Sequence, residues 1–416
     1  YQKLTDAPIL VAAADTVHLQ VGNADILISV YSPNEKIKAS EVAKQLKPLL
    51  NAQLTYLGGK FPVNNYAFLI VMSEHLKNGS YGALEHAQSS FYYLPEDSIA
   101  VMGPIIRDVS AHEFFHIQTP LNLHSAEIGN FDFQNPQMSK HLWLYEGLTE
   151  YAAQHMQLQG GLISLSEFLE RMTEKYRTSN FSYDNSIPFT KMSKGVLSKY
   201  KEEYGNVYQK GALIGMCIDI IIREKSHGER GILNLMQQLS KEYGVHKAFK
   251  DEELFAKITA LTYPEVGNFL STYVSGSTPI PYEIFLAKVG VSKSKDKKAG
   301  NVFLKGQTPY ITVDKATKEI LVRSNTDLID FYKNLDLRAN DIIMAVNNKA
   351  YTLDNIYDMI GESENWKEND AITIKIKRDG KEQILTGKVS LPYEEIEGLQ
   401  ATDATKANLK NAWLKG

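Results

Sequence analysis

The first third of the chain contains apolar runs that are typical of strands and one helical repeat. Residues 24–31 alternate apolar and polar side chains, and residues 66–72 form a short run of aromatic and aliphatic side chains, so both segments are expected to be strands. Between them, valine and leucine recur at helical spacing after Ser40, the expected N-cap, and the repeat stops at Gly58-Gly59. This order predicts a sheet with a helix packed on it.

Two more segments, residues 89–94 and 98–103, have the apolar character that is expected of strands. From residue 108 to about residue 275, apolar positions recur at helical spacing almost without interruption. A sheet followed by helices is the order of an α+β protein, and α+β is therefore the predicted fold class.

The chain changes character between about residues 276 and 300. A Ser-Gly-Ser-Thr-Pro segment that ends at Pro279 and a further proline, Pro281, are followed by a lysine-rich stretch, which indicates a linker or a domain edge. Beyond it, short strand-like runs, a helix at about residues 353–361 and a turn at Asp379-Gly380 predict a small, separate β-rich domain.

Composition and charge narrow the classes of function. The chain of 416 residues is long enough for roughly two to three domains. Its formal net charge is -4 and it has no basic stripe with interleaved aromatic side chains, so we expect no nucleic-acid partner. No apolar run reaches the roughly 18 to 20 residues that are needed to cross a bilayer, so no membrane span is expected.

The start of the sequence bears on the expected location. The sequence begins at Tyr1 rather than at methionine, so we expect that an upstream segment has been removed and that it held any export signal. The prediction is an extracytoplasmic protein, periplasmic or secreted, and a cytoplasmic location stays open as the alternative. Cys217 is the single cysteine and has no intrachain disulfide partner, so it leaves the compartment undecided.

The candidate chemistry centres on the segment HEFFH at residues 112–116. Its two histidines are four residues apart, which on a helix places both imidazoles on one face and within reach of one ion. Glu113 lies about 100° round the helix, where it can reach a water on that ion rather than the ion itself. Zinc hydrolysis requires neutral nitrogens that hold the metal and a free carboxylate that accepts a proton. His112 and His116 are therefore the predicted ligands, and Glu113 is the predicted catalytic base.

A catalytic zinc needs a third protein ligand, which must come from a second element. The helical segment WLYEGLTEY at residues 143–151 offers two carboxylates, Glu146 and Glu150, one turn apart on the same face. One can bind the metal while the other accepts a hydrogen bond from a ligand imidazole. Spacing alone leaves this choice open.

These two segments resemble those of the gluzincin zinc peptidases, and specifically the glycyl aminopeptidase family whose members carry a C-terminal PDZ domain. The resemblance implies a thermolysin-like catalytic domain, made of a small mixed sheet and a helical subdomain, with one Zn²⁺ per chain. In the family pattern the glutamate directly before glycine is the zinc ligand. This implies Glu146 as the third ligand and leaves Glu150 to orient a ligand imidazole.

A further resemblance lies in the segment YGALEH at residues 81–86. It is similar to the family's Gly-Gly-Leu-Glu-His segment, which lines the substrate cleft and implies that Gly82, Ala83 and Glu85 bind substrate. Glu85 corresponds to the glutamate that meets the substrate's free α-amino group in related aminopeptidases, a charge-assisted contact. Ala83 stands where the family has glycine and is expected to narrow the space for a substrate side chain.

Two more motifs extend the resemblance over nearly the whole chain. The segment YQKG at residues 208–211 is similar to the family's Tyr-x-Lys-Gly element, in which Tyr208 would donate a hydrogen bond to the oxyanion. Tyr204 is a nearby competitor for that role. The segment LTDAP at residues 4–8 resembles the stretch that joins an N-terminal β-domain to the catalytic domain.

The C-terminal part resembles a PDZ domain at residues 337–349. Asn340 and Asn348 stand where glycine is usual in that pattern, and asparagine is the next residue best able to adopt a positive φ. PDZ domains bind extended peptides, so a peptide or protein ligand is one expectation for this domain. The chain has no clear Gly-Leu-Gly-Phe-like carboxylate loop, so a structural or regulatory role is an equal alternative.

These motifs also set the expected domain boundaries. The predicted parts are residues 1–22 as a remnant of, or linker from, an N-terminal β-domain, 23–160 as the thermolysin-like zinc catalytic subdomain, 161–285 as the helical subdomain, 286–300 as a linker, 301–395 as the PDZ-like domain and 396–416 as a C-terminal tail.

The function that follows is a zinc-dependent metallopeptidase acting on peptides by attack of a metal-activated water. By resemblance it is an aminopeptidase that removes small N-terminal residues, Gly or Ala. One alternative is an endopeptidase of the same fold, in which Glu85 does not anchor an amine. Another is a non-catalytic scaffold that binds peptides through its PDZ domain.

Overall fold

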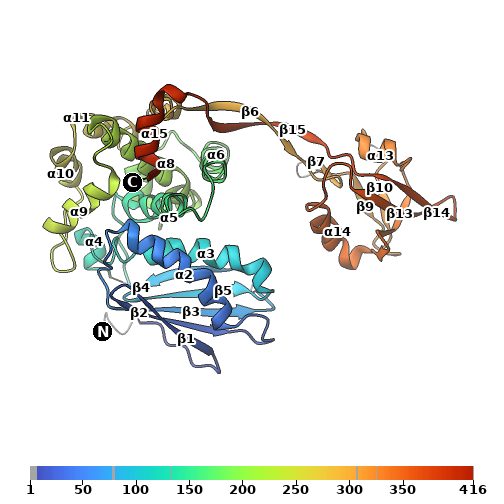
Figure 1. The fold of residues 1–416 in the computed structure, drawn as a ribbon, viewed down its shortest axis with the longest axis horizontal. Helices are drawn as coiled ribbons and strands as arrows, with labels where there is room; N and C mark the ends of the chain where they lie inside the picture. The colour runs from blue at the N-terminus through green and yellow to red at the C-terminus, as the bar shows by residue number, and fades with distance from the viewer. Residues whose placement is uncertain (1–6, 77–79, 133, 306–307, 325, 416) are drawn as a thin grey trace. The chain divides into compact units, whose positions relative to one another are not determined.

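The computed structural model divides the chain into two compact units, which are drawn in Figure 1. The structure describes residues 7–76, 80–132, 134–305, 308–324 and 326–415. The units are Tyr1–Lys293 with Leu399–Gly416, and Ser294–Gly398.

The first unit begins with a five-stranded mixed sheet, as the sequence predicts. The strand order is β1-β2-β3-β5-β4, with the three central strands parallel and the two edge strands antiparallel to their neighbours. Strand β4 therefore has one neighbour, β5, and its other edge carries no strand among the described residues. The strands are β1 (Asp15–Val21), β2 (Ala24–Tyr31), β3 (Asn65–Ser73), β4 (Gly82–His86) and β5 (Ser89–Pro95).

Helices α2 (Ala39–Tyr56) and α3 (Ile99–Phe115) lie on one face of this sheet (Figure 1). Their apolar side chains and those of the strands form one core. The expected N-cap Ser40 is wrong by two residues, because the cap is Lys38, whose backbone N–H donates to Glu41 Oε2 at 2.9 Å. Helix α2 and the sheet together support α3, whose last turn and C-cap carry HEFFH.

The prediction of a strand at residues 98–103 is wrong. Ser98 is extended and precedes α3, which begins at Ile99. Met102 and Ile106, one helical turn apart, are buried in the same core as the strands. A short apolar run has no period that distinguishes the start of a buried helix from a strand, so packing decided its structure.

The rest of the first unit is helical. Helix α8 is buried along its whole length from Lys210 to Arg223, as expected of a helix that forms the centre of a core. In the part of the chain that the structure describes, no helix combines the length and apolar character needed to cross a membrane. The elements are α4 (Ala126–Gly129), η2 (Trp143–Gly147), α5 (Leu148–Gln159), α6 (Leu165–Ser182), α7 (Phe189–Gly195), η3 (Lys201–Glu203), α8 (Asn206–Lys225), α9 (Ile232–Glu242), α10 (Leu254–Leu261), α11 (Pro264–Phe269), η4 (Leu270–Val274) and α12 (Tyr282–Lys288).

The second unit is a small β-rich body with its own core. Its larger sheet has the order β14-β13-β11-β10-β9, and β12 pairs with β11. Asn340 and Asn348 have φ of 69° and 68°, as expected for residues that replace glycine in turns. That this unit is a PDZ domain stays a prediction. Its elements are β7 (Leu304–Lys305), β8 (Thr308–Pro309), β9 (Ile311–Val313), β10 (Ile320–Val322), α13 (Asp330–Asn334), β11 (Ile342–Val346), β12 (Lys349–Ala350), η5 (Leu353–Asn355), α14 (Ile356–Ser363), β13 (Ala371–Arg378) and β14 (Lys381–Lys388).

Three expected segments differ in the structure. Residues 1–22, expected as a remnant of or linker from an N-terminal β-domain, contain strand β1, which pairs with β2 of the same sheet; residues 1–6 lie outside the described residues. The expected linker at 286–300 contains strand β6 (Val291–Ala299), which pairs with β15 (Tyr393–Ala401). The expected tail at 396–416 continues from β15 through η6 (Ala404–Lys406) into helix α15 (Ala407–Lys415), which packs on α5 and α8. Trp413 of α15 is fully buried there, and the chain ends among the helices of the first unit (Figure 1). Strand β6 is mostly polar, whereas α15 carries Leu409, Trp413 and Leu414 at helical spacing, and these side chains pack on the core of the first unit.

Candidate active site

The two histidines of HEFFH are brought together at the end of α3. His112 lies in its last turn and His116 is its C-cap, with the ring centroids 4.9 Å apart. His112 Nδ1 lies 2.9 Å from Glu150 Oε2, and His116 Nδ1 lies 2.8 Å from the carbonyl oxygen of Thr119. Because these partners are acceptors, each Nδ1 carries the ring proton and each Nε2 keeps a free lone pair.

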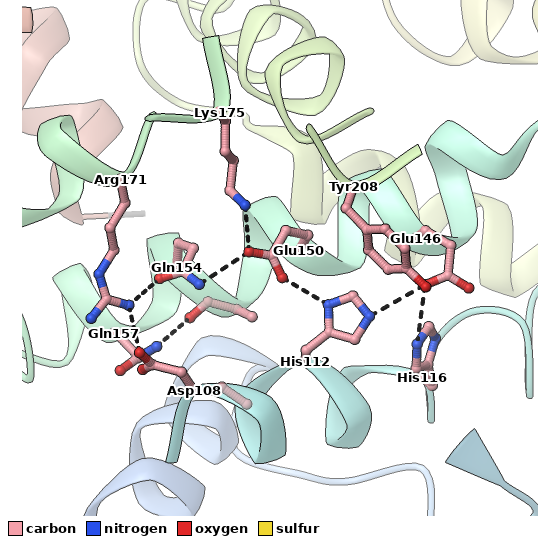
Figure 2. Close-up of polar contacts among 12 residues, drawn as sticks. Asp108, His112, His116, Glu146, Glu150, Gln154, Gln157, Arg171, Lys175 and Tyr208 are labelled. Atoms are coloured by element: carbon pink, nitrogen blue, oxygen red, sulfur yellow. Dashed lines mark hydrogen bonds and ion pairs between the residues drawn. The ribbon is translucent and has the colours of Figure 1, made fainter. Parts of the chain in front are cut away.

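Both Nε2 atoms face the carboxylate of Glu146. Glu146 Oε2 lies 3.3 Å from His112 Nε2 and 3.7 Å from His116 Nε2 (Figure 2). One ligand atom from each of these three residues lies within 4.8 Å of the other two. Two imidazole nitrogens and one carboxylate are a donor set of catalytic zinc, and they leave a coordination position for water or substrate. These residues therefore fit a zinc ion.

Glu146 and Glu150, which spacing left as alternatives, face different atoms of the cluster. Glu146 lies on a π-helical turn, η2, and Glu150 lies on α5, which follows directly. The wider turn places the Glu146 carboxylate at the Nε2 side of His112 and the Glu150 carboxylate at its Nδ1 side (Figure 2). A π turn inside a helix is often found at a functional site. The geometry thus favours Glu146 as the ligand and Glu150 as its support.

Two glycines allow η2 to approach α8 closely. A Cβ at Gly147 would lie 2.4 Å from the backbone of Gly211, and a Cβ at Gly211 would lie 2.8 Å from Gly147 Cα. Any side chain at either position would push the two helices apart. The contact places Tyr208, one turn before Gly211, beside Glu146, the residue before Gly147 (Figure 2).

Burial and neighbouring charges keep Tyr208 protonated. Its pKa lies well above the usual value because the side chain is buried and the charge of Glu146 is close. Its ring centroid is 5.6 Å from that of His112, and its hydroxyl forms a hydrogen bond with Glu146. Tyr204 lies 3.1 Å away, hydroxyl to hydroxyl. Tyr208 is thus a hydrogen-bond donor at the cluster, and Tyr204 is in contact with it.

Glu113 has the environment of a general base. Burial raises the pKa of its carboxyl to about 7; His112 and His116 lower it, whereas the charge of Glu85 raises it. Its Oε2 is buried and has no hydrogen-bond partner among the described residues. A carboxylate with a pKa near neutrality and a free oxygen can accept a proton and release it again.

The predicted cleft residues lie on the edge strand β4. Carboxylate oxygens of Glu85 and Glu113 and a ring nitrogen of His116 lie within 4.8 Å of one another, so Glu85 adjoins the cluster. The side chain of Ala83 lies on the same face of β4 as that of Glu85 and packs against the core that the sheet forms with α2 and α3. A Cβ added at Gly82 would have no atom within 4 Å. The structure therefore brings one of these three, Glu85, to the metal cluster.

Sequence reasoning missed three parts of the site. The π turn has no sequence signal that distinguishes it from an α-helix. The Thr119 partner of His116 is a backbone carbonyl, a group that every residue carries, so the sequence does not mark it. Lys175 of α6, whose Nζ lies 2.7 Å from Glu150 Oε1, is remote in sequence from every motif. Each of these three depends on how separate segments pack.

Comparison with known proteins agrees with this site. Residues 106–214 match the family described as M61 glycyl aminopeptidase. This segment is about a quarter of the chain. It contains the three candidate ligands and also Glu113, Glu150 and Tyr208, but it does not include Glu85. A comparison with curated proteins found no match.

One solved structure shares the fold over most of this chain, and two others are similar over a smaller part. The aminopeptidase N family protein from Idiomarina loihiensis is 18% identical with a TM-score of 0.63, over 97% of this chain and 71% of that one. An M1 zinc metallopeptidase from Deinococcus radiodurans is 16% identical with a TM-score of 0.43, over 65% and 52% of the two chains. Yeast LTA4 hydrolase in complex with Bestatin is 14% identical with a TM-score of 0.45, over 64% and 40%. This chain covers about half or less of the length of the last two proteins, and no argument is based on their low TM-scores.

The peptidase match covers the segment in which two imidazoles, a carboxylate and an unpaired buried base converge. The fold of the first solved structure extends over nearly the whole chain. The chain is accordingly a zinc metallopeptidase.

Proposed function

We propose that this protein is an aminopeptidase that removes small N-terminal residues, Gly or Ala, from peptides. The observation that carries the proposal is Glu85, a carboxylate outside the ligand set whose oxygen lies within 4.8 Å of both Glu113 and His116. A carboxylate at this place can form a charge-assisted hydrogen bond with a free α-ammonium, a group that an internal peptide bond does not present.

In this proposal His112, His116 and Glu146 hold one zinc ion per chain. Bound zinc would lower the pKa of a water molecule and polarise the scissile carbonyl. Glu113 accepts the proton of the attacking water at its free Oε2 and passes it to the leaving amine. Glu150 holds the Nδ1 proton of His112, so that Nε2 stays available.

The substrate is held by groups on two sides of the cluster. Tyr208 donates its hydroxyl proton in a hydrogen bond to the oxyanion that develops on the substrate carbonyl. Glu85 pairs with the substrate's α-ammonium and so sets the distance from the N-terminus to the bond that is cut. The edge of β4 at Gly82 and Ala83, which has no strand neighbour among the described residues, offers backbone groups to the substrate.

Matched substrates test the amine anchor. N-acetylation removes the ammonium and leaves the Glu85 carboxylate without its partner, which costs about 2 to 5 kcal/mol. Free Gly and Ala substrates should therefore be cut far faster than their N-acetylated forms. Glu85→Ala should raise KM for the free forms, abolish the discrimination and leave zinc content unchanged. Equal kcat/KM for free and acetylated substrates in the unmutated protein would instead favour an endopeptidase.

For the second unit we propose a PDZ-like fold that binds an extended peptide or a protein segment at a sheet edge. The support is the small sheet with the asparagine turns at Asn340 and Asn348, and strand β9, which has one strand neighbour among the described residues. We also propose an extracytoplasmic location. Binding of peptide libraries to the isolated enzyme and to a variant with a proline in β9 tests the proposed peptide site. Cell fractionation tests the proposed location.

A further inference from the structure

Helix α6 presents two basic side chains, one turn apart, to the helices that carry the metal cluster. Lys175 Nζ lies 2.7 Å from Glu150 Oε1 on α5. One turn earlier, Arg171 reaches Asp108 on α3 at 3.2 Å and donates a hydrogen bond to Gln154 on α5. Figure 2 shows these contacts as a continuous row that ends at His112. The row therefore ties α6 to α3, whose last turn and C-cap supply His112 and His116, and to α5, which follows directly after the turn η2 that supplies Glu146.

Glu150 is the point at which this row meets the cluster. Its Oε1 accepts from Lys175 Nζ and from Gln154 Nε2, the latter at 3.2 Å, and its Oε2 accepts from His112 Nδ1 at 2.9 Å. The side chains of Glu150 and Lys175 are 15% and 12% exposed. Of the three donors, Lys175 is the one with a full charge, so it provides the main compensation for a carboxylate that has left water.

Two consequences follow for His112. The ion pair with Lys175 Nζ at 2.7 Å compensates the charge of the Glu150 carboxylate, and Glu150 Oε2 accepts the Nδ1 proton of His112 at 2.9 Å. Its other oxygen is fixed by Lys175, so it cannot rotate away from the imidazole without breaking an ion pair.

We propose that Lys175 is a positioning residue of the metal site, which holds the Glu150 carboxylate where it orients His112 toward the metal. The proposal rests on the zinc site described above. The charged contact of Lys175 is with Glu150 and not with a candidate ligand, so its effect passes through Glu150. Its loss should therefore weaken metal binding even though all three ligands remain.

The direct test is the zinc dissociation constant, measured by competition with a chelator. Loss of an interaction that orients a ligand typically costs about tenfold to 100-fold in metal affinity. We expect Lys175→Met to raise the zinc Kd at least about tenfold and Lys175→Arg to restore most of the affinity. The matched control is Lys288→Met, which removes an ion pair of 2.6 Å with Glu224 at 28% and 34% exposure, outside this row. That variant should leave the zinc Kd unchanged.

A double-mutant cycle separates a positioning role from general destabilisation. If Lys175 acts through Glu150, Lys175→Met should add nothing to the rise in zinc Kd caused by Glu150→Gln. Additive effects of the two substitutions, or an unchanged zinc Kd in Lys175→Met, would overturn the proposal. If Lys175→Met does not fold, Lys175→Gln takes its place in the same cycle.

Failure of the zinc site itself gives a different result. In that case the unmutated protein would not bind one equivalent of zinc, or His116→Ala would bind it as tightly. If the unmutated protein binds one zinc, His116→Ala loses it and Lys175→Met binds it as tightly as before, the zinc site stands and only the role of Lys175 is overturned.

Discussion

Single residues in this site differ in function because of which atom of a shared partner they face. Glu146 and Glu150 are chemically identical and one turn apart, yet one meets His112 Nε2 and the other its Nδ1. Glu113, next to His112, keeps a buried Oε2 that has no hydrogen-bond partner among the described residues. The role of each carboxylate in the cluster thus depends on geometry, since its chemistry is the same.

Glu113 allows a test at this scale. Glu113→Gln should leave one zinc bound, because the three ligands are untouched, but it should lower kcat on the order of 10³-fold or more, because an amide cannot accept the water proton. Metal analysis and steady-state kinetics on the same preparation measure both. Glu146→Ala is the contrasting variant, which should lose zinc. Zinc loss in Glu113→Gln would show that Glu113 is itself a ligand.

At the scale of elements, the site depends on the close contact of η2 with α8. Both helices carry glycine where they meet, and this brings a ligand from one and Tyr208 from the other to the same cluster. The two glycines are part of the motifs that sequence reasoning singled out, EG and KG. Glycine is required at these two positions for steric reasons and not for backbone conformation, because neither position has a positive φ.

Gly147→Ala should separate these two helices. The added Cβ would lie 2.4 Å from the backbone of Gly211, where no side chain can move aside, so we expect a loss of about 1 to 3 kcal/mol in stability together with lower activity. Denaturant unfolding and kinetics measure the two effects. Gly103→Ala is the control, because its Cβ would meet the flexible side chain of Gln45 at 3.2 Å. Equal behaviour of the two variants would contradict the steric explanation.

At the scale of the whole molecule, the chain returns to the first unit after forming the second. Trp413 of α15 donates from Nε1 to Tyr151 at 2.9 Å, and its carbonyl accepts from His155 Nε2 at 2.6 Å. Arg223 Nη1 donates to the carbonyl of Ala412 at 2.6 Å. The second unit is therefore an insertion whose two ends both join the first unit, and α15 belongs to the core that supports α5.

His155 makes this anchoring sensitive to pH. Burial lowers its pKa to about 4, so the native state binds this proton less readily than the unfolded chain, whose histidine has a pKa of about 6.5. The stability that depends on neutral His155 is complete above about pH 6.5 and is lost as the pH falls toward 4. Between pH 7 and pH 5 the expected loss is about 2 kcal/mol in the free energy of unfolding.

Urea unfolding of the zinc-free protein at pH 7 and pH 5 measures this loss. His155→Gln replaces the imidazole by a group that does not titrate, and should show a decrease that is smaller by that amount. The comparison cancels contributions from other histidines, because both proteins contain them. The same decrease in both would exclude His155 as the cause.

The sequence by itself determined the features that depend on neighbours along the chain. Four-residue spacing is enough to put His112 and His116 on one helical face with Glu113 beside them, because helical geometry is local. Strongly patterned strands such as residues 24–31 and 66–72, and the turn asparagines Asn340 and Asn348, follow from equally local rules.

Only the tertiary structure decided the features that depend on packing between remote segments. Residues 99–103 are helical because the helix that they begin packs on the sheet, although the run alone is equally compatible with a strand. The separation of Glu146 from Glu150 required the π turn and the Gly147–Gly211 contact, and Lys175 reaches Glu150 from a helix with no motif. The last helix docks through the buried side chain of Trp413 and also through the backbone carbonyls of Ala412 and Trp413, and these carbonyl contacts have no sign in the sequence because every residue carries the group.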